Sequence, residues 1–418
     1  MRFANTQEAP VSSPPPYSET LAQRIGVVKL DHDPDLVDRI VRGVFDGDPV
    51  ADRLITSFKD LPGGAGWRMV DEALDNGPDA VEGAPAELAD LVAPALRPPE
   101  WVDLDLVDAG ANAYWRSGGL NLGLALICGS LAYGYKSSRL TRPLAATGRL
   151  EKMAPRRIQE TSRWVTVATK PGALHPGAEG MHATVRLRLV HALVRAHLAA
   201  DPSWDWPEWG VPISASDSLV TGIGGFMTIP VKALNDLGVR FSPAELEAMT
   251  HQWTWISALM GTPDYLLPRS YREARETMDT ALALDEGPNE DSPKLMRALL
   301  YDGIELPLEA KLPPPLKWPV RALKARYVGG FARRWMDEEM ADRLGVPRTR
   351  LARLALCFLR PLTLLREVAR AVHLLGSDER IAQMELGLVE RVSDLRFGAV
   401  ETIDPQQAER EPVLDAAA

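Results

Sequence analysis

The most informative pattern of apolar and polar positions lies in the middle of the chain, at residues 180–200. This segment, GMHATVRLRLVHALVRAHLAA, is rich in Ala, Leu and Arg and has no Pro, which predicts one helix. Its polar residues Thr184, Arg188, His191 and Arg195 recur at helical spacing and therefore share one face between apolar flanks. The segment contains no acidic residue, so a buried basic stripe needs a partner from elsewhere.

Two kinds of partner fit this stripe. Acidic side chains from another part of the chain would make the segment a partly exposed basic helix held by ion pairs. A planar, anionic and apolar cofactor such as haem would instead use the imidazole of His191 for its iron and the guanidinium groups of Arg188 and Arg195 for its propionates. The local pattern leaves both interpretations open.

Helical patterns also cover most of the chain before this segment. Residues 117–135 carry no charge but contain five Gly, which favours a buried helix of small residues, able to form a wall beside a cofactor, over a membrane span. Residues 150–169 predict a helix on which Arg157, Glu160 and Thr161 share one face. Further helices are predicted at residues 34–45, 50–59, 67–74, 86–92 and 105–116.

The chain after the central segment is helical as well. Ser242, Pro243 and Glu245 mark the start of a helix that runs to about residue 260. Breaks are predicted at Pro230, at residues 312–315 together with Pro319, and at Pro361. Further helices are predicted at residues 273–284, 335–344 and 348–376. Tryptophans gather at positions 204, 206, 209, 253 and 255, which suggests that they line one region of the fold.

The patterns together predict an all-α protein built as a single large helical domain. No alternating run with hairpin turns occurs; residues 164–169 come nearest to one. Residues 1–20 are rich in Pro and Ser and predict a disordered segment, residues 21–403 the helical domain, and residues 404–418 a flexible tail.

Composition narrows the possible functions. The net charge of −10 argues against binding to nucleic acid, and no segment predicts an integral membrane span. The N-terminus lacks a basic region followed by an apolar one, so we expect a cytoplasmic protein. Cys128 and Cys357 lie in apolar runs and predict buried free thiols. No phosphate-binding loop, HExxH or GxSxG motif occurs, and no Glu-x-x-His pair supports a di-iron bundle, which leaves a single histidine with arginine neighbours.

Several short motifs follow one another along the chain: Arg157-x-x-x-Thr161, Trp164-Val165, Val185-Arg186-x-x-x-x-His191-x-x-x-Arg195, Trp209-Gly210-x-Pro212 with Asp217, Thr221 to Phe226, and His251-x-Trp253. Over roughly residues 40 to 375, this order resembles the mpaB-type and latex-clearing-protein family of oxygenases. The resemblance implies an all-helical, globin-like core that binds a b-type haem. It also implies that His191 is the proximal iron ligand and that Arg157 and Thr161 lie on the distal side.

One position departs from the resemblance. Rubber-cleaving members carry a Lys between the matching Arg and Thr, where this chain has Glu160, and they carry an export signal that the N-terminus does not show. We therefore expect an oxygenase that uses dioxygen on a small apolar, unsaturated substrate other than rubber, with Glu160 as a candidate base. The alternatives are a haem peroxidase-like enzyme and a haem-binding sensor or carrier without turnover. A haem-free helical scaffold also stays open, and the oligomeric state is not predicted.

Overall fold

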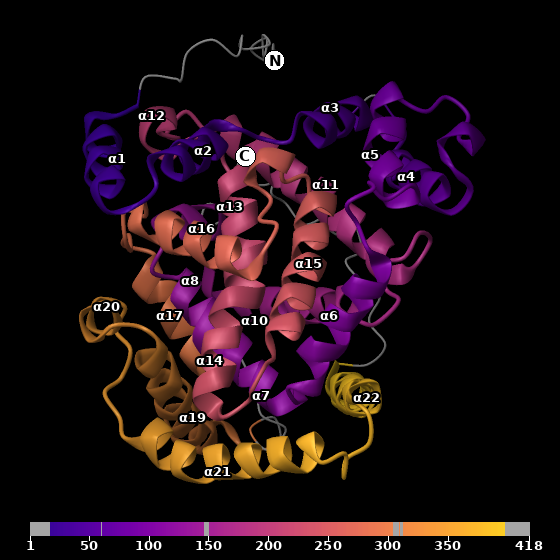
Figure 1. Ribbon diagram of the computed structural model, residues 1–418. Helices are drawn as coiled ribbons and strands as arrows, with labels where there is room; N and C mark the ends of the chain where they lie inside the picture. Colours follow the sequence, from indigo (N-terminus) through magenta and orange to yellow (C-terminus); the bar gives the residue numbers. More distant parts are fainter. Residues whose placement is uncertain (1–16, 60, 146–149, 304–308, 310–311, 398–418) are drawn as a thin grey trace.

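The computed structural model describes residues 17–59, 61–145, 150–303, 309 and 312–397. Within these ranges every regular element is helical, which confirms the predicted all-α fold (Figure 1). The elements up to residue 199 are α1 (Glu19–Asp31), α2 (Pro34–Phe45), α3 (Pro49–Phe58), α4 (Ala65–Asn76), η1 (Pro78–Ala80), α5 (Ala86–Leu96), α6 (Leu104–Arg116), α7 (Gly119–Leu124), η2 (Ala125–Leu131), α8 (Ala132–Gly134), α9 (Ser138–Ala145), α10 (Leu150–Ala168) and α11 (Glu179–Ala199).

The remaining elements follow α11 in the sequence. They are α12 (Trp206–Trp209), α13 (Ala215–Leu219), η3 (Val220–Thr228), α14 (Ile229–Leu237), α15 (Pro243–Leu259), η4 (Asp264–Leu266), α16 (Tyr271–Ala283), α17 (Ser292–Tyr301), α19 (Pro314–Trp335), α20 (Glu338–Arg343), α21 (Leu351–Ala371) and α22 (Asp378–Phe397). α1 begins two residues before the predicted start of the helical domain. The predicted end of that domain at residue 403 lies outside the described residues, and the division of the chain stays a prediction.

Helix ends follow their local signals closely. α11 covers the central segment almost as predicted, and α15 starts with a capping box in which Ser242 and Glu245 satisfy each other's backbone N–H groups. The predicted helix at 335–344 is instead divided between the end of α19 and α20. Residues 164–169, the nearest approach to a strand pattern, belong to α10 and the turn after it.

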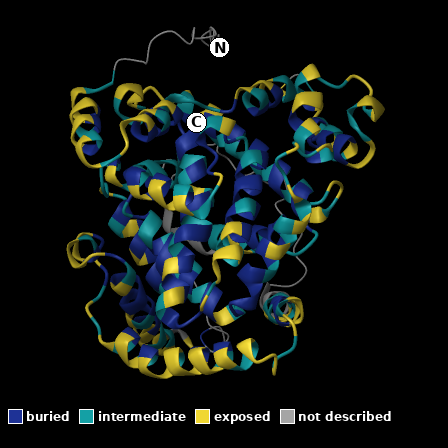
Figure 2. Ribbon diagram, viewed as in Figure 1, coloured by how far each residue is buried: buried dark blue, intermediate teal, exposed yellow. Residues whose placement is uncertain are grey.

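α6 and α15 pack against each other at the centre of the molecule (Figure 1). Gly110 of α6 permits this crossing, because a Cβ atom there would overlap the carbonyl oxygen of Ala248 in α15. Around this pair the main apolar core extends from Ala51 to Leu386, and a second, smaller cluster joins α1 and α2 to Leu284. Figure 2 shows the buried residues gathered in the middle of the fold and exposed residues along the outer helices.

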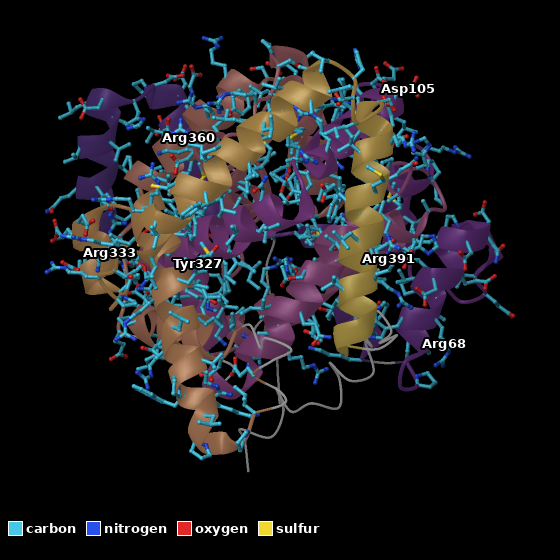
Figure 3. All side chains as sticks on the ribbon, turned by 90° about the horizontal axis from the view of Figure 1, so that it is seen from below. Arg68, Asp105, Tyr327, Arg333, Arg360 and Arg391 are labelled. Carbon is cyan, nitrogen blue, oxygen red and sulfur yellow. The ribbon has the colours of Figure 1, made fainter. Side chains whose placement is uncertain are left out.

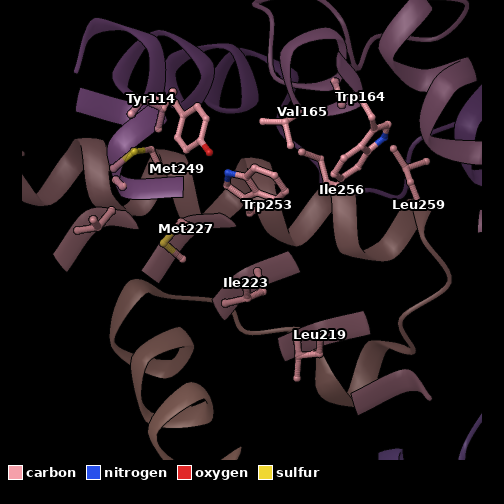
Figure 4. Packing of buried hydrophobic residues seen from close by; sticks show 14 of the residues in the cluster. Tyr114, Trp164, Val165, Leu219, Ile223, Met227, Met249, Trp253, Ile256 and Leu259 are labelled. Carbon is pink, nitrogen blue, oxygen red and sulfur yellow. The ribbon is translucent and has the colours of Figure 1, made fainter. Parts of the chain in front are cut away.

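The core is centred on Trp253 of α15 (Figure 4). Its indole stacks on Phe226 with ring centroids 5.1 Å apart, and Trp164 and Tyr114 approach its edge at 6.2 and 5.9 Å. Aromatic contacts of this kind stabilise a core beyond the apolar area that they bury. These residues come from η3, α10, α6 and α15, so the cluster joins four elements that lie far apart in the sequence.

The tryptophan pattern does not mark one lining, contrary to the prediction. Trp253 and Trp255 are completely buried in the core. Trp204 and Trp209 pack on each other at 5.2 Å in the segment after α11, and Trp206 is 42% exposed. The five residues therefore divide between the core and the surface.

The predicted breaks at three prolines are also wrong. Pro230 lies in the first turn of α14, where the hydrogen-bond ladder changes from π-helical to α-helical and a missing N–H costs little. Pro319 and Pro361 lie inside α19 and α21. Because a proline has no N–H, the carbonyl groups four residues earlier, of Pro315 and Cys357, lose their helical hydrogen bonds. Both of these residues are exposed, so their carbonyl groups can bond water instead.

The two cysteines lie in different surroundings. Cys128 is buried, as predicted, but Cys357 is exposed on α21, because its apolar run faces outward instead of into the core. Among the described residues, no helix is both long enough and apolar enough to cross a bilayer.

Candidate functional site

α11 carries the polar stripe, and aspartates at the start of α3 hold its two arginines. Arg188 makes a bidentate ion pair with Asp48, with Nε–Oδ2 at 2.6 Å and Nη2–Oδ1 at 2.8 Å, and both side chains are almost fully buried. Arg195 Nε lies 2.8 Å from Asp52 Oδ1, and its Nη1 donates to the carbonyl oxygen of Ile213 at 2.8 Å. The acidic partners that the central segment lacks therefore come from a segment about 140 residues earlier.

The structure shows the ion pairs of Arg188 and Arg195 that the first of the two interpretations of the stripe requires. Gly261, at a φ of +87°, lies against the Arg188 pair, and a Cβ atom there would overlap Asp48. The pair is therefore closely enclosed. A contact of either arginine with a cofactor stays a prediction.

His191 differs from the two arginines because its Nδ1 is buried without a hydrogen-bond partner among the described residues. Burial, together with the positive charge of Arg195, lowers the pKa of His191 to about 4, and the carboxylate of Asp48 offsets only part of this shift. The imidazole is therefore neutral near pH 7. Neutral imidazole is the form that binds a metal ion.

The face of α11 beside His191 is apolar but not closed. Ala183, Leu187, Val190 and Val194 recur at helical spacing and share this face with His191. All five residues are partly exposed, although α11 packs against α3, α5, α10 and α15. Apart from Glu179 at its first position, α11 has exposed residues only in its last turn. His191 thus lies at the border between the polar stripe and an apolar side of α11 whose residues are partly exposed.

The second group of predicted site residues lies on α10. Arg157 is partly buried, and its Nη1 donates to the carbonyl oxygen of Leu144 at 3.2 Å. Burial lowers the pKa of Arg157, and the charge of Glu160 works in the opposite direction. Glu160 makes an ion pair with Arg156 at 2.8 Å, in which more than a third of each side chain is exposed. Thr161 is exposed.

α10 and α11 form an antiparallel pair. Trp164 Nε1 donates to Thr184 Oγ1 at 3.3 Å, and Gly180 lies against the backbone of Val167. Residue numbers therefore fall along α10 as they rise along α11, as expected for two helices joined by a short connection.

This register relates the two groups of predicted residues. Arg157 lies seven residues before Trp164, and His191 lies seven residues after Thr184. Arg157 and Trp164 share one face of α10, and Thr184 and His191 lie on one face of α11. Extending the register from this contact predicts that Arg157 and His191 lie at a similar level along the pair.

Two stretches of π-helix, η2 and η3, contact each other near this helix pair. Wide π-helical turns occur frequently at functional sites. η2 belongs to the small-residue segment 117–135 that was predicted to form a wall beside a cofactor. Tyr135, at the end of this segment, is buried and lies close enough to Arg157 for their charges to interact. The segment therefore reaches the Arg157 end of the site.

Sequence reasoning missed three residues of this arrangement. Asp48 and Asp52 were readable as the start of a helix, but nothing local pointed to α11 as their partner. Tyr135 could have been found as the last residue of the uncharged run 117–135. Within the described part of the chain, no three His, Cys, Asp or Glu side chains gather to hold a metal ion, so His191 is a candidate as a single ligand.

The fold and the site define an all-helical protein with one buried histidine nitrogen that has no hydrogen-bond partner among the described residues. The sequence profile of the family described as "ER-bound oxygenase mpaB/B'/Rubber oxygenase, catalytic domain" matches residues 115–374, which is more than half of the 418 residues. The chain therefore belongs to the mpaB and rubber oxygenase catalytic-domain family, as the resemblance predicted. The matched range includes the helix pair α10 and α11.

Two relatives show how far the similarity extends. The chain is 27% identical over 290 residues to the rubber oxygenase of Streptomyces sp. (strain K30), which covers 68% of this chain and 64% of that protein. The chain thus matches slightly less than two thirds of that relative's length. It also resembles the structure of latex clearing protein in the closed state, with a TM-score of 0.59 and 22% identity over 82% of this chain and 91% of that one. This second likeness establishes a shared fold.

Proposed function

We propose that the protein is a haem b-dependent oxygenase that uses dioxygen on a small, apolar, unsaturated substrate. The observation that supports this proposal is the neutral imidazole of His191, which has no hydrogen-bond partner at Nδ1 among the described residues and lies beside partly exposed apolar residues of α11. The family description as oxygenases and the name of the K30 relative agree with it.

The residues around His191 fit a haem group. His191 would be the iron ligand, and Leu187, Val190 and Val194 would contact the macrocycle and exclude water. Arg188 and Arg195 hold α11 against α3 through their ion pairs and so fix the direction of His191. Bound haem would supply an iron centre at which dioxygen is activated.

Residues of α10 would act on the oxygen and the substrate. The guanidinium of Arg157 would donate hydrogen bonds to negative charge on oxygen, with the hydroxyl of Thr161 as a second donor. Glu160 accepts a proton from the substrate once its ion pair with Arg156 opens. A carboxylate in place of the lysine of rubber-cleaving members favours a substrate other than rubber.

Oxygen uptake tests this proposal. The haem-reconstituted protein is mixed with a panel of unsaturated apolar compounds, and dioxygen consumption is compared in wild type, Arg157→Gln and the matched control Arg163→Gln on the same helix. We expect turnover that falls about a hundredfold in Arg157→Gln only, the cost of losing one donor to an oxyanion. Haem binding without uptake would favour a carrier or sensor, and turnover only with hydrogen peroxide would favour a peroxidase.

A further inference from the structure

Exposed apolar side chains are concentrated in the last part of the described chain. Of the 18 large hydrophobic residues that are exposed, 14 lie between positions 316 and 392, on or next to α19, α21 and α22. Figure 3, seen from below, shows these three helices on the same side of the molecule. The 14 residues are Leu316, Trp318, Leu323, Leu354, Phe358, Leu362, Leu364, Leu365, Val368, Val372, Leu374, Met384, Leu388 and Val392.

The apolar residues of α21 form a continuous stripe. Leu354, Phe358, Leu362, Leu365, Val368 and Val372 follow one another at intervals of three and four residues, and each is between 58% and 66% exposed. We call these six residues the α21 stripe. A patch of this extent on a protein surface marks an interaction site.

The opposite face of α21 fixes the helix to the core. Ala352, Leu356, Thr363 and Glu367 are buried. Glu367 pairs at 3.3 Å with Arg116 of α6, which is completely buried. α21 is therefore held firmly along the lower edge of the molecule, with the α21 stripe facing outward (Figures 1 and 2).

The α21 segment carries a positive charge of its own, although Arg348, Arg366 and Arg370 pair with Asp342, Glu385 and Asp378 from neighbouring segments. Residues 344–374 contain six Arg and one acidic residue, a net of +5, in a chain whose total is −10. The acidic residue, Glu367, is buried and already paired, whereas Arg353 and Arg360 are exposed on α21. An apolar stripe flanked by arginines is the pattern of a helix that lies in the plane of a membrane surface.

We propose that the α21 stripe rests on the surface of an anionic phospholipid bilayer, with Arg353 and Arg360 contacting lipid phosphate groups. Charge decides between this partner and a second copy of the chain, because two copies would bring like-charged segments together. An anionic bilayer complements both the apolar side chains and the arginines. No described helix is suited to spanning the bilayer, so the contact is a peripheral one. This inference does not depend on the haem proposal.

Vesicle sedimentation of the full-length protein tests the proposal. Vesicles of phosphatidylcholine with phosphatidylglycerol are compared with vesicles of phosphatidylcholine alone. Phe358→Gln with Leu365→Gln removes part of the stripe, and Val27→Gln with Leu30→Gln, at exposed apolar positions of α1, is its control. Arg353→Gln with Arg360→Gln removes two charges, and Arg68→Gln with Arg272→Gln is the charge-matched control.

We expect binding to the anionic vesicles only. Loss of the two arginines lowers the partition coefficient about 30-fold, at roughly fivefold for each charge near the surface. Loss of the two apolar side chains lowers it at least about tenfold, and both control variants bind as wild type does. Equal binding to neutral vesicles, or equal losses in the controls, would overturn the proposal. A dimer in solution that Phe358→Gln with Leu365→Gln dissociates, without vesicle binding, would replace it with a self-association surface.

Discussion

Removal of the Asp48 carboxylate should destabilise the protein more than any surface ion pair does. In Asp48→Ala the guanidinium of Arg188 stays buried without its partner, which costs about 3–5 kcal/mol. The same carboxylate caps α3 by accepting the N–H of Ala51 at 3.2 Å, and loss of a cap costs about 1 kcal/mol more. We therefore expect the free energy of unfolding to fall by about 4–6 kcal/mol.

Urea unfolding followed by far-UV circular dichroism measures this change, provided that the slope with denaturant stays constant. Asp38→Ala is the control, because Asp38 pairs with Lys29 but is 61% exposed, and such a pair is worth about 0–1 kcal/mol. Asp48→Ala combined with Arg188→Met removes both charges and should recover part of the loss. A cost of Asp48→Ala as small as that of Asp38→Ala would refute the argument that burial makes this pair important.

Three further predictions concern pH, the core and the surface. As pH falls from about 6.5 to 4, the unfolded state takes up a proton at His191, whereas the folded state keeps this imidazole neutral. The free energy of unfolding of wild type should therefore fall by up to about 3 kcal/mol, and His191→Gln should lack this contribution. The same pH dependence of urea unfolding in both proteins would disprove this. Trp253→Ala should cost about 3–5 kcal/mol in urea unfolding and Trp206→Ala less than about 1, and similar costs would contradict the assigned core. Glu160→Ala should change stability by less than about 1 kcal/mol, since its ion pair with Arg156 is largely solvated; a larger thermal shift would show that the pair is structural.

The helices could be predicted where periodicity and end signals agree. The central segment has uniform helix-forming composition, and Ser242 with Glu245 forms a capping box that is visible in the sequence. The predicted breaks at prolines failed because the cost of a proline depends on where its lost carbonyl partner points. At Pro319 and Pro361 that carbonyl belongs to an exposed residue, which a local pattern does not reveal.

The candidate site could be predicted only in part. The spacing of Arg188, His191 and Arg195 showed that they share a face, and the family resemblance singled out His191. The pairing of the arginines with Asp48 and Asp52 joins residues about 140 positions apart, and only the folded chain brings them together. The structure thus separates the stripe into two arginines with structural partners and one histidine without a partner at Nδ1.

The exposure of α21 was the least predictable feature. Its apolar run reads as a core helix, and this led to the wrong expectation that Cys357 is buried. Only the packing of Ala352, Leu356 and Glu367 against the rest of the fold shows which face is buried and which is left outside.

The absorption spectrum of the haem-reconstituted protein tests the central claim most directly. Wild type is compared with His191→Ala and with His197→Ala, whose histidine lies on the same helix but is exposed. The account predicts a Soret band in wild type and His197→Ala that is lost or shifted in His191→Ala. A Soret band that is the same in all three proteins, or absent from wild type, would contradict the assignment of His191 as the haem ligand.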